Sequence, residues 1–516
     1  MASTSDLDPV PSRAIMLPDI LTLIFEYLAI RTDHVLPRRD RRTPCSEWLP
    51  AINTCRTWRR VAISTTRIWC YIWTALSPSL AWMFLQRSKA APLYLWSCNS
   101  ESNWQTVSMV LHHTHLHRLK EVEIMDCDQH VWFKTLLDNP ASQLEVLTLC
   151  GSTPWDNARC CFSTNALHDS APALRKLHIF GFSFELDPRF LSNLTHLNLS
   201  FCGNDRILED MDRFSPYELL VALQGMPHLQ KLTLGAVLDP EYEIPTLEDD
   251  VGVNLLGLTY LEFEVEFMLD FQILQYLAFP SIKSIVLRCD EVADPADISV
   301  ITPILHGLLP PHDSSLTHTA VVIEASGSKL YSKPESRTTI KLEAGPTEMP
   351  PVKLKLALVG TTCFQCEDFL ETFYPLLDSI DTLDFDGYAE AQDGKDPSIF
   401  ASFFHVTATE LRVSGLADII FALASTPKRP REDGQPLSYP LPNLQAISLF
   451  QQRDSKDTRQ LVACIKRLLL ERKALGAAVE ILEVVLKRGR KTTAAYKITP
   501  QDMEPLTEIL EVAFLP

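Results

Sequence analysis

The stretch LPDILTLIFEYL, from Leu17 to Leu28, combines a helix-start signal with an apolar face. Pro18 suits the first helical position, because its missing N–H is not needed there and its fixed φ matches a helix. Ile20, Ile24 and Leu28 are four residues apart and therefore share one side of a helix. The stretch predicts an amphipathic helix at the N-terminal end of the chain.

A second helical pattern follows in WLPAINTCRTWRRVAISTTRIW, residues 48–69. Its apolar positions Leu49, Ile52, Cys55 and Trp58 are three residues apart, which is typical of a helix face. Two helices within about sixty residues bury too little apolar surface to form a strong core alone. We therefore expect a partner for the apolar surface that remains.

Three features of these helices resemble the F-box. They are the Leu-Pro start, the Ile-Phe-x-x-Leu end of the first helix, and Cys-x-x-Trp-Arg in the second, with Trp69 following. The resemblance implies three packed helices that dock on the small adaptor subunit of cullin–RING ubiquitin ligases. The adaptor-binding residues that it implies are Leu17, Pro18, Ile20, Ile24, Phe25, Leu28, Cys55 and Trp58. The chain departs from the family pattern by an insertion between the helices, at residues 31–46. Any two amphipathic helices of a core share this spacing, but the three features occur together and in order.

Composition excludes several classes of protein. The net charge of −18 argues against nucleic-acid or anionic-membrane binding, which requires clustered Lys and Arg. The thirteen cysteines follow no disulfide framework and indicate a reduced compartment. No stretch has the length and apolarity of a membrane helix, and the first residues have no signal-peptide pattern. We expect a soluble protein of the cytoplasm, the nucleus or both.

The rest of the chain repeats an L-x-x-L-x-L pattern in which Val, Ile or Phe can replace Leu. Steps between the first seven matches are 25, 30, 20, 35, 29 and 24 residues, close to those of leucine-rich repeats. The last two apolar positions differ by two, so they share one face of a short strand. The matches begin at Leu119, Leu144, Leu174, Leu194, Leu229, Leu258, Ile282, Ile380 and Leu444.

A proline stands two residues before four of these matches, at Pro172, Pro227, Pro280 and Pro442. Proline ends helices and favours extended backbone before it, so it marks the boundary between units. One such unit cannot bury its own apolar face and must stack on its neighbours. The same reasoning leaves residues 290–375 without a recognisable repeat.

The fold class that these patterns predict is α/β. We expect a three-helix F-box followed by an irregular leucine-rich-repeat solenoid with a parallel sheet on its concave face. The expected boundaries are a disordered tail at 1–14, the F-box at 15–76 and the solenoid at 77–516. Near the C-terminus, the pattern predicts helices at 457–473 and 505–513 and a strand at 479–486.

The sequence contains few motifs that indicate catalysis or metal binding. Cys363 and Cys366 form a lone Cys-x-x-Cys pair without a second pair at zinc spacing. Four histidines at 112–117 have Leu111, Leu116 and Leu119 as neighbours, which favours a helix or turn leading into a repeat over a metal site. Nucleophile-elbow, zincin and phosphate-loop motifs do not occur. We therefore expect a non-catalytic protein without cofactor or metal.

Under the F-box resemblance, the repeats would hold a protein target beside the ligase. The predicted target-binding residues alternate with buried strand positions: Lys176, His178, Phe180, His196, Asn198, Lys231, Tyr260, Glu262, Glu264 and Arg288. Their mixed charge predicts a protein rather than a nucleic acid as the target, whose identity stays open. Two alternatives remain: a repeat scaffold whose F-box-like helices only cap the solenoid, and an enzyme in a divergent α/β domain.

Overall fold

The computed structural model describes residues 18–31, 45–96, 104–124, 139–150, 171–181, 186, 191–201, 213–239, 252–291, 319–328, 335–344, 353–357, 382–386, 410–414, 423, 440–450, 458–474, 479–485 and 511–515. The chain forms two compact units, residues 1–213 with 221–229 and residues 214–220 with 230–516. Each unit combines helices with largely parallel strands, which confirms the predicted α/β class. Within the described ranges, no helix has the length and apolarity needed to span a bilayer.

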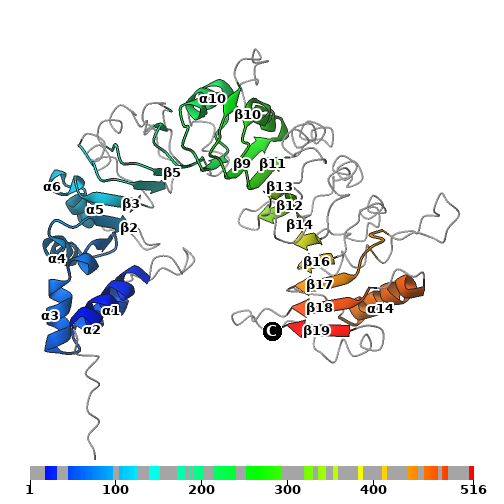
Figure 1. Ribbon diagram of the computed structural model, residues 1–516, viewed down its shortest axis with the longest axis horizontal. Coiled ribbons are helices and arrows are strands. Elements are labelled where there is room, and N and C mark those ends of the chain that lie inside the picture. The colour runs from blue at the N-terminus through cyan, green and yellow to red at the C-terminus, as the bar shows by residue number, and fades with distance from the viewer. Residues whose placement is uncertain are drawn as a thin grey trace, which may run out of the picture. The chain divides into compact units, whose positions relative to one another are not determined.

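The first unit begins with three helices that pack on one another, α1 (Pro18–Arg31), α2 (Cys45–Ile52) and α3 (Arg56–Ser64) (Figure 1). A 3-10 turn, η3 (Thr66–Trp69), follows α3, and its Trp69 indole donates a hydrogen bond to the Ala62 carbonyl at 2.9 Å. The side chains that fill this helical core are Leu21, Phe25, Ala29, Ile52, Val61, Ala62, Ile68 and Trp69. These helices therefore have a core of their own, small as it is.

The helical core continues into the strands without a break. Helix α4 (Pro78–Ser88) begins with a first-turn proline after Ser77, as the sequence predicts. Its Phe84 meets the Trp69 ring edge-on, with the ring centroids 5.1 Å apart. Strand β1 (Tyr71–Trp73) precedes α4 in the sequence, and strand β2 (Leu93–Trp96) follows it. The two strands pair in parallel.

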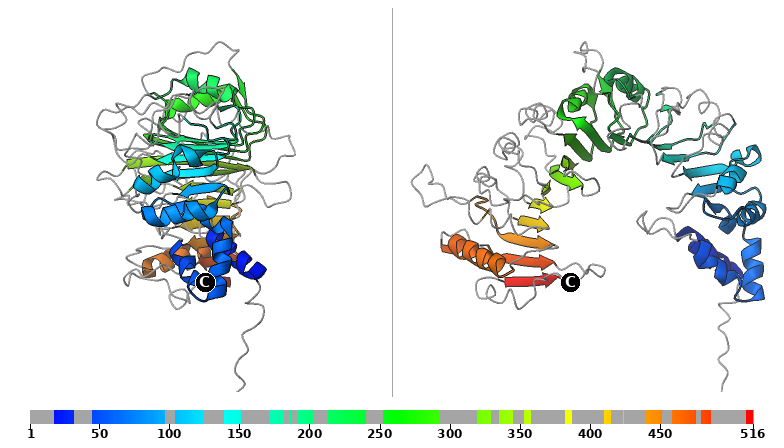
Figure 2. Two further views of the ribbon diagram at one scale, coloured as in Figure 1. Left: turned by 90° about the vertical axis from the view of Figure 1, so that its left-hand side faces the viewer. Right: turned by 180° about the vertical axis from the view of Figure 1, so that it is seen from behind.

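The first unit extends this pair into a parallel sheet by adding β3 (Leu119–Ile124), β4 (Val146–Cys150), β5 (Lys176–Phe180) and β6 (His196–Ser200). The helices α4, α5 (Trp104–Val110) and α6 (His113–Leu116) lie along one side of its first strands (Figures 1 and 2). In-register leucine and isoleucine side chains form continuous buried rows across the strands. One such row contains Val122, Leu147, Leu177 and Leu197.

The first apolar position of the repeat forms a tight turn before seven of the strands. The Leu144 N–H donates to the Ala141 carbonyl at 2.9 Å, and the Leu174 N–H donates to the Ala171 carbonyl at 3.1 Å. The same bond, from an N–H to the carbonyl three residues earlier, recurs at Leu194, Leu229, Leu258, Ile282 and Leu444. This turn explains why the pattern has an anchor residue outside the strand as well as two inside it.

The second unit begins with strands β7 (Lys231–Gly235), β9 (Tyr260–Phe267) and β11 (Ser284–Glu291), which pair in parallel. A small parallel pair, β8 (Val253–Asn254) and β10 (Leu277–Ala278), and the 3-10 helix η5 (Met268–Tyr276) occupy the connections. Helix α10 (Pro216–Gln224) precedes β7 and has a capping box, in which the Ser215 and Glu218 side chains each bond the other's backbone N–H.

The expectation of one continuous parallel sheet is wrong in the second unit. Strand β13 (Glu335–Ala344) runs antiparallel to β11 on one side and to β12 (Thr319–Ser328) on the other. Strand β12 then pairs in parallel with β14 (Lys353–Ala357). The cause is a hairpin, since Ser328 and Glu335 are register partners that only a short connection separates. Residues 290–375 lack the repeat because part of this segment is a hairpin.

Parallel pairing resumes after β14, through β15 (Thr382–Asp386), β16 (Glu410–Ser414), β17 (Ala446–Phe450), β18 (Ile481–Val485) and β19 (Glu511–Leu515). Helix α14 (Thr458–Ala474) lies beside β17 and β18, as predicted. The predicted helix over 505–513 is wrong in its last part, because Glu511 to Ala513 belong to β19. Val512 and Phe514 of β19 are the register partners of Leu482 and Val484 of β18. Apolar residues at every second position are typical of a strand.

Candidate docking surfaces

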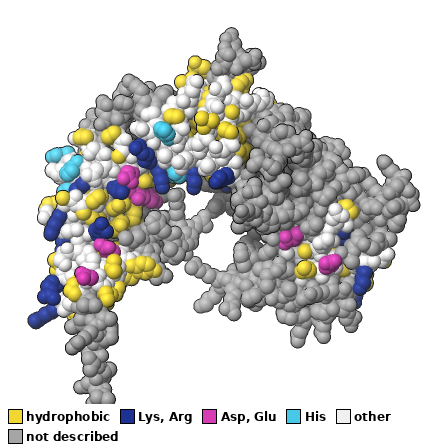
Figure 3. Space-filling model, in the orientation of Figure 1, with side chains coloured by type: hydrophobic (Ala, Val, Ile, Leu, Met, Phe, Trp, Pro, Cys, Tyr) yellow, Lys and Arg dark blue, Asp and Glu magenta, His cyan; other side chains and the backbone are white. Residues whose placement is uncertain are grey.

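Helix α1 carries two apolar faces, and only one of them is buried. Leu21, Phe25 and Ala29 point into the helical core, with at most 4% of each residue exposed. The other face is a stripe at helical spacing (i, i+3, i+4, i+7), and its exposed fractions are Ile20 38%, Leu23 65%, Ile24 37% and Tyr27 57%. Figure 3 shows hydrophobic side chains at the surface over these N-terminal helices. We call these four residues the α1 stripe.

The predicted adaptor-binding residues divide between this surface and the core. Pro18, Ile20, Ile24 and Cys55 are exposed. Leu28 and Trp58 are half-buried, and Leu17 lies outside the described residues. The stripe also contains two residues that the family pattern does not mark, Leu23 and Tyr27. Their spacing from Ile20 and Ile24 is the signal that could have revealed them.

Phe25 was expected at the adaptor surface, and this expectation is wrong. The side chain is fully buried and meets the Trp58 ring edge-on, with centroids 5.7 Å apart and planes at 83°. The reason is the helical period: Phe25 lies four residues from Leu21 and from Ala29, so the three share the face that packs on α3. Phe25 therefore supports the helical core instead of a docking surface.

The predicted target residues of the first unit come together on two adjacent strands. Register pairs Lys176 with His196 and His178 with Asn198, and Phe180 lies one step further along β5. Lys176 is exposed and the other four are half-buried, on the sheet face opposite the leucine rows. The Asn198 Oδ1 atom is buried without a hydrogen-bond partner among the described residues. These five side chains lie together and combine a charged group with several hydrogen-bonding groups. We call them the polar patch.

Sequence reasoning missed an aromatic group on the same sheet. The rings of Tyr71, Tyr94 and Trp96 stack at the start of the sheet, with the Tyr71 centroid 4.8 Å from that of Tyr94 and 5.2 Å from that of Trp96. The alternation in YIW and LYLW was the available signal. Beside this group, Lys120 and Glu145 form an ion pair at 3.2 Å, and the carboxylate raises the pKa of Lys120.

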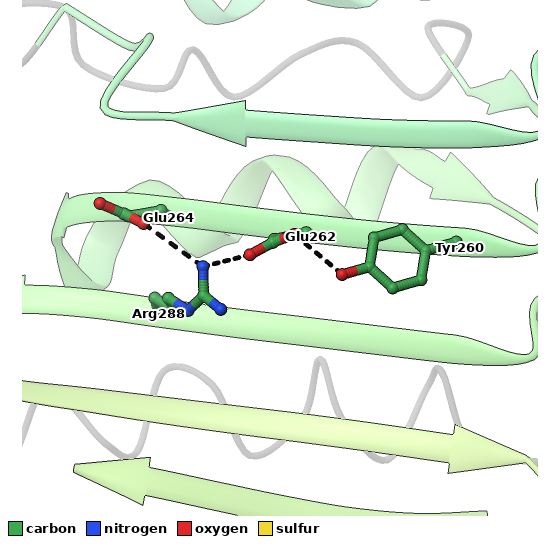
Figure 4. Close-up of polar contacts among 4 residues, drawn as sticks. All are labelled: Tyr260, Glu262, Glu264 and Arg288. Carbon is green, nitrogen blue, oxygen red and sulfur yellow. Dashed lines mark hydrogen bonds and ion pairs between the residues drawn. The ribbon is translucent and has the colours of Figure 1, made fainter. Parts of the chain in front are cut away.

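The predicted target residues of the second unit form a connected polar cluster. Tyr260, Glu262 and Glu264 alternate along β9, and Arg288 faces Glu264 in register from β11 (Figure 4). Arg288 forms an ion pair with Glu262, and its Nη1 atom lies 3.7 Å from Glu264 Oε2. The Tyr260 hydroxyl donates to Glu262 Oε2 at 2.8 Å. Lys231 is the register partner of Tyr260 on β7 and is exposed.

Burial limits which members of this cluster face solvent. Only 8% of Glu264 is exposed, so it acts mainly as a partner of Arg288 and its expected role as a direct target contact is reduced. Burial raises the pKa of Tyr260 to about 12, and the hydrogen bond to Glu262 adds to the shift. Tyr260 is therefore a neutral hydrogen-bond donor throughout the physiological range.

No group of three metal-ligating side chains forms among the described residues. In the histidine segment, burial and nearby Arg118 lower the pKa of His115, and the His112 and His113 rings lie 4.0 Å apart. The Cys363–Cys366 pair lies outside the described residues.

Comparison with known proteins gives no family assignment. No protein-family model matches the chain, and no curated protein matches it in sequence.

Proposed function

We propose that this protein is the substrate-recruiting F-box subunit of a cullin–RING ubiquitin ligase. Its N-terminal helices would dock on the adaptor subunit, and its repeat strands would hold a protein target. The chain itself would break and form no bonds. Holding a target beside the ubiquitin carrier raises the effective concentration of the target's lysines, which makes transfer nearly intramolecular.

The α1 stripe is the observation that carries this proposal. A helix at a protein's edge normally buries its apolar side chains, yet α1 leaves Leu23 and Tyr27 more than half exposed. The helical core is already filled by Leu21, Phe25 and Trp69, so the stripe is surplus to it. An exposed apolar helix face of this kind is typical of a binding site. The F-box resemblance supplies the identity of the partner.

We propose a target-binding surface in each unit: the polar patch on β5 and β6 in the first unit, and the cluster on β9 and β11 in the second. Strand faces that present mixed charges, histidines and a tyrosine suit a protein target, because aromatic and arginine side chains dominate the binding energy of protein interfaces. Among these residues, Lys176 and Lys231 are exposed and are therefore the groups best placed for such contacts.

A second function, a scaffold whose helices only cap the repeats, is favoured by one observation. The helical core continues into α4 through the Trp69–Phe84 contact, and η3 and α4 in turn pack on strand β1. A capping role does not explain why the α1 stripe is exposed. We therefore prefer the proposal of a ligase subunit.

The experiment measures binding of the full chain to the adaptor subunit by isothermal titration calorimetry. We expect the wild-type chain to bind and Leu23→Ser/Tyr27→Ser to bind at least about 2 kcal/mol more weakly, or about thirtyfold, if the stripe is a central anchor. The matched control, Leu256→Ser/Tyr217→Ser, removes a leucine and a tyrosine of similar exposure elsewhere and should bind like wild type. A wild-type chain that does not bind the adaptor would favour the scaffold. Equal binding by a folded stripe variant would remove the docking assignment from α1.

A further inference from the structure

A groove among α2, α3 and α4 has one basic half and one apolar half. Five cations line the basic half, which has a volume of about 610 Å³: Arg56, Arg59, Arg60, Arg87 and Lys89. The apolar half has a volume of about 550 Å³ and is lined by Leu49, Pro50, Ile52, Trp69 and Met83. Ile63, Arg59 and Arg87 line both halves, so the two are continuous. We call this feature the basic groove.

The positive charge of the basic groove is not neutralised by the described part of the chain. No Asp or Glu is among the described residues that line either half. Arg59 donates to the neutral Asn53 side chain at 3.0 Å, and the Arg87 guanidinium lies 4.3 Å from the centre of the Trp69 ring. Both contacts position the cation, and neither pairs it with a carboxylate of a described residue. The chain as a whole carries −18, so this cluster opposes the overall charge.

The position of these arginines is also unfavourable for the helix that carries them. Arg56 and Arg59 lie in the first turn of α3, which has no acidic residue. The positive end of the helix dipole disfavours cations there. Lys89 ends α4 with a φ of 51°, a backbone conformation that lysine rarely adopts. An anion bound in the groove would offset the repulsion among these cations.

We propose that the basic groove binds an acidic segment of a partner protein. Carboxylates of the segment would bind the arginines, which present paired donors that match carboxylate geometry. An apolar side chain of the same segment would enter the second half, against Ile63 and Met83. This inference does not depend on the proposed adaptor docking, because the α1 stripe belongs to another helix.

Two other polyanions fit the groove less well. A nucleic acid would place phosphates along the basic half and has no aliphatic side chain to fill the apolar half. An anionic membrane surface is flat and cannot enter both halves of a groove. A short peptide with acidic residues around an apolar one matches both halves.

The test measures fluorescence anisotropy of a labelled peptide with the full chain at about 0.15 M salt. The probe has two leucines flanked on each side by three glutamates. Its matched control replaces every glutamate with glutamine. We expect the glutamate peptide to bind and the glutamine peptide to bind at least about tenfold more weakly.

Protein variants locate the site. Arg56→Glu/Arg60→Glu should weaken binding of the glutamate peptide at least about tenfold, because both side chains line the basic half. Lys283→Glu/Lys473→Glu changes the net charge equally at two exposed residues of the second unit and should bind like wild type. Ile63→Ser should weaken binding while leaving the glutamate–glutamine difference in place. A circular dichroism spectrum checks that each variant is folded.

Three outcomes would overturn the proposal. They are no binding of the glutamate peptide by the wild-type chain, equal loss in the two double variants, and tighter binding of a single-stranded oligonucleotide or a phosphatidylserine vesicle than of the peptide. In the last case the groove would be a general anion site and not a peptide site.

Discussion

Cys55 and Cys70 lie fifteen residues apart in the sequence and in opposite environments. Cys55 is exposed at the start of α3, whereas only 3% of Cys70 is exposed and its thiol donates to the Thr66 carbonyl at 3.4 Å. Burial raises the pKa of Cys70 to about 11, although Arg118 and Arg67 oppose the shift. The reactive form of a thiol is its thiolate, so burial protects Cys70 in two ways.

We predict that iodoacetamide at pH 8 modifies Cys55 at least about 100-fold faster than Cys70 in the folded chain. Peptide mapping by mass spectrometry after timed pulses measures both rates in one sample. In urea the protection of Cys70 should disappear, because the unfolded thiol regains its ordinary pKa. Similar rates for the two residues in the folded chain would show that η3 and β1 open readily around Cys70.

Tyr260 provides a prediction with a defined pH window. Its folded pKa of about 12 is above the ordinary value of 10, so the unfolded state releases the phenol proton first as pH rises. The stability that Tyr260 contributes is therefore present below pH 10 and is lost between pH 10 and 12. We expect Tyr260→Phe to lower the free energy of unfolding by about 1 kcal/mol at pH 8, through loss of the bond to Glu262. Urea unfolding of both proteins at pH 8 and 11 should show a smaller difference at pH 11, and a constant difference would contradict the assigned role of the hydroxyl group.

Among the secondary-structure elements, α14 depends on one buried cation. Arg472 is fully buried, and its guanidinium donates to the carbonyls of Pro440, Leu441 and Pro442 at 3.1, 2.8 and 3.5 Å. Leu441 has a φ of 54°, a strained value for a residue with a side chain. Arg472 therefore holds the turn that leads into β17 and joins it to α14.

We expect Arg472→Met to lower the free energy of unfolding by about 2–4 kcal/mol, because the buried Pro440 and Leu441 carbonyls and the partly buried Pro442 carbonyl would lose their donor. Arg467→Met changes an exposed arginine of the same helix and should have an effect of no more than about 0.5 kcal/mol. Urea unfolding followed by far-ultraviolet circular dichroism measures both. If the two variants were equally stable, the carbonyl bonds would contribute little to the turn.

Individual elements were predicted well where a local pattern determines them. Each L-x-x-L-x-L match coincides with a strand, β3, β4, β5, β6, β7, β9, β11, β15 or β17, because the turn and the alternation are both encoded locally. The role of Arg472 could not be predicted, since its partners lie 30 to 32 residues earlier in the chain. Antiparallel pairing of β13 was missed for a different reason: this segment has no L-x-x-L-x-L match, and the direction of a strand depends on the strands that it pairs with.

The candidate sites were predictable in position and less so in exposure. Alternation along β9 placed Tyr260, Glu262 and Glu264 on one face, and the structure brings them together with Arg288. Helical spacing places Phe25 on an apolar face of α1. It does not show which of the two apolar faces of this helix packs on α3. For this reason Phe25 was assigned to the surface, while Leu23 and Tyr27 were overlooked.

At the scale of the whole molecule, the two units differ in a way that spectroscopy can use. All nine tryptophans lie between residues 48 and 155 and therefore belong to the first unit. Tryptophan fluorescence thus reports on the first unit alone, whereas far-ultraviolet circular dichroism reports on both. In repeat folds, each element contacts mainly its neighbours, so distant parts can unfold at different denaturant concentrations.

We predict that a destabilised core in one unit leaves the other unit's transition unchanged. Phe25→Ala removes a fully buried ring of the first unit and should lower the urea midpoint of the fluorescence transition, at a loss of about 3–5 kcal/mol. Arg472→Met should instead lower the midpoint of a circular dichroism component and leave the fluorescence midpoint at its wild-type value. A single transition that moves equally by both probes in both variants would contradict independent unfolding. In that case the chain would unfold as one cooperative body, and stability measured at either end would describe the whole.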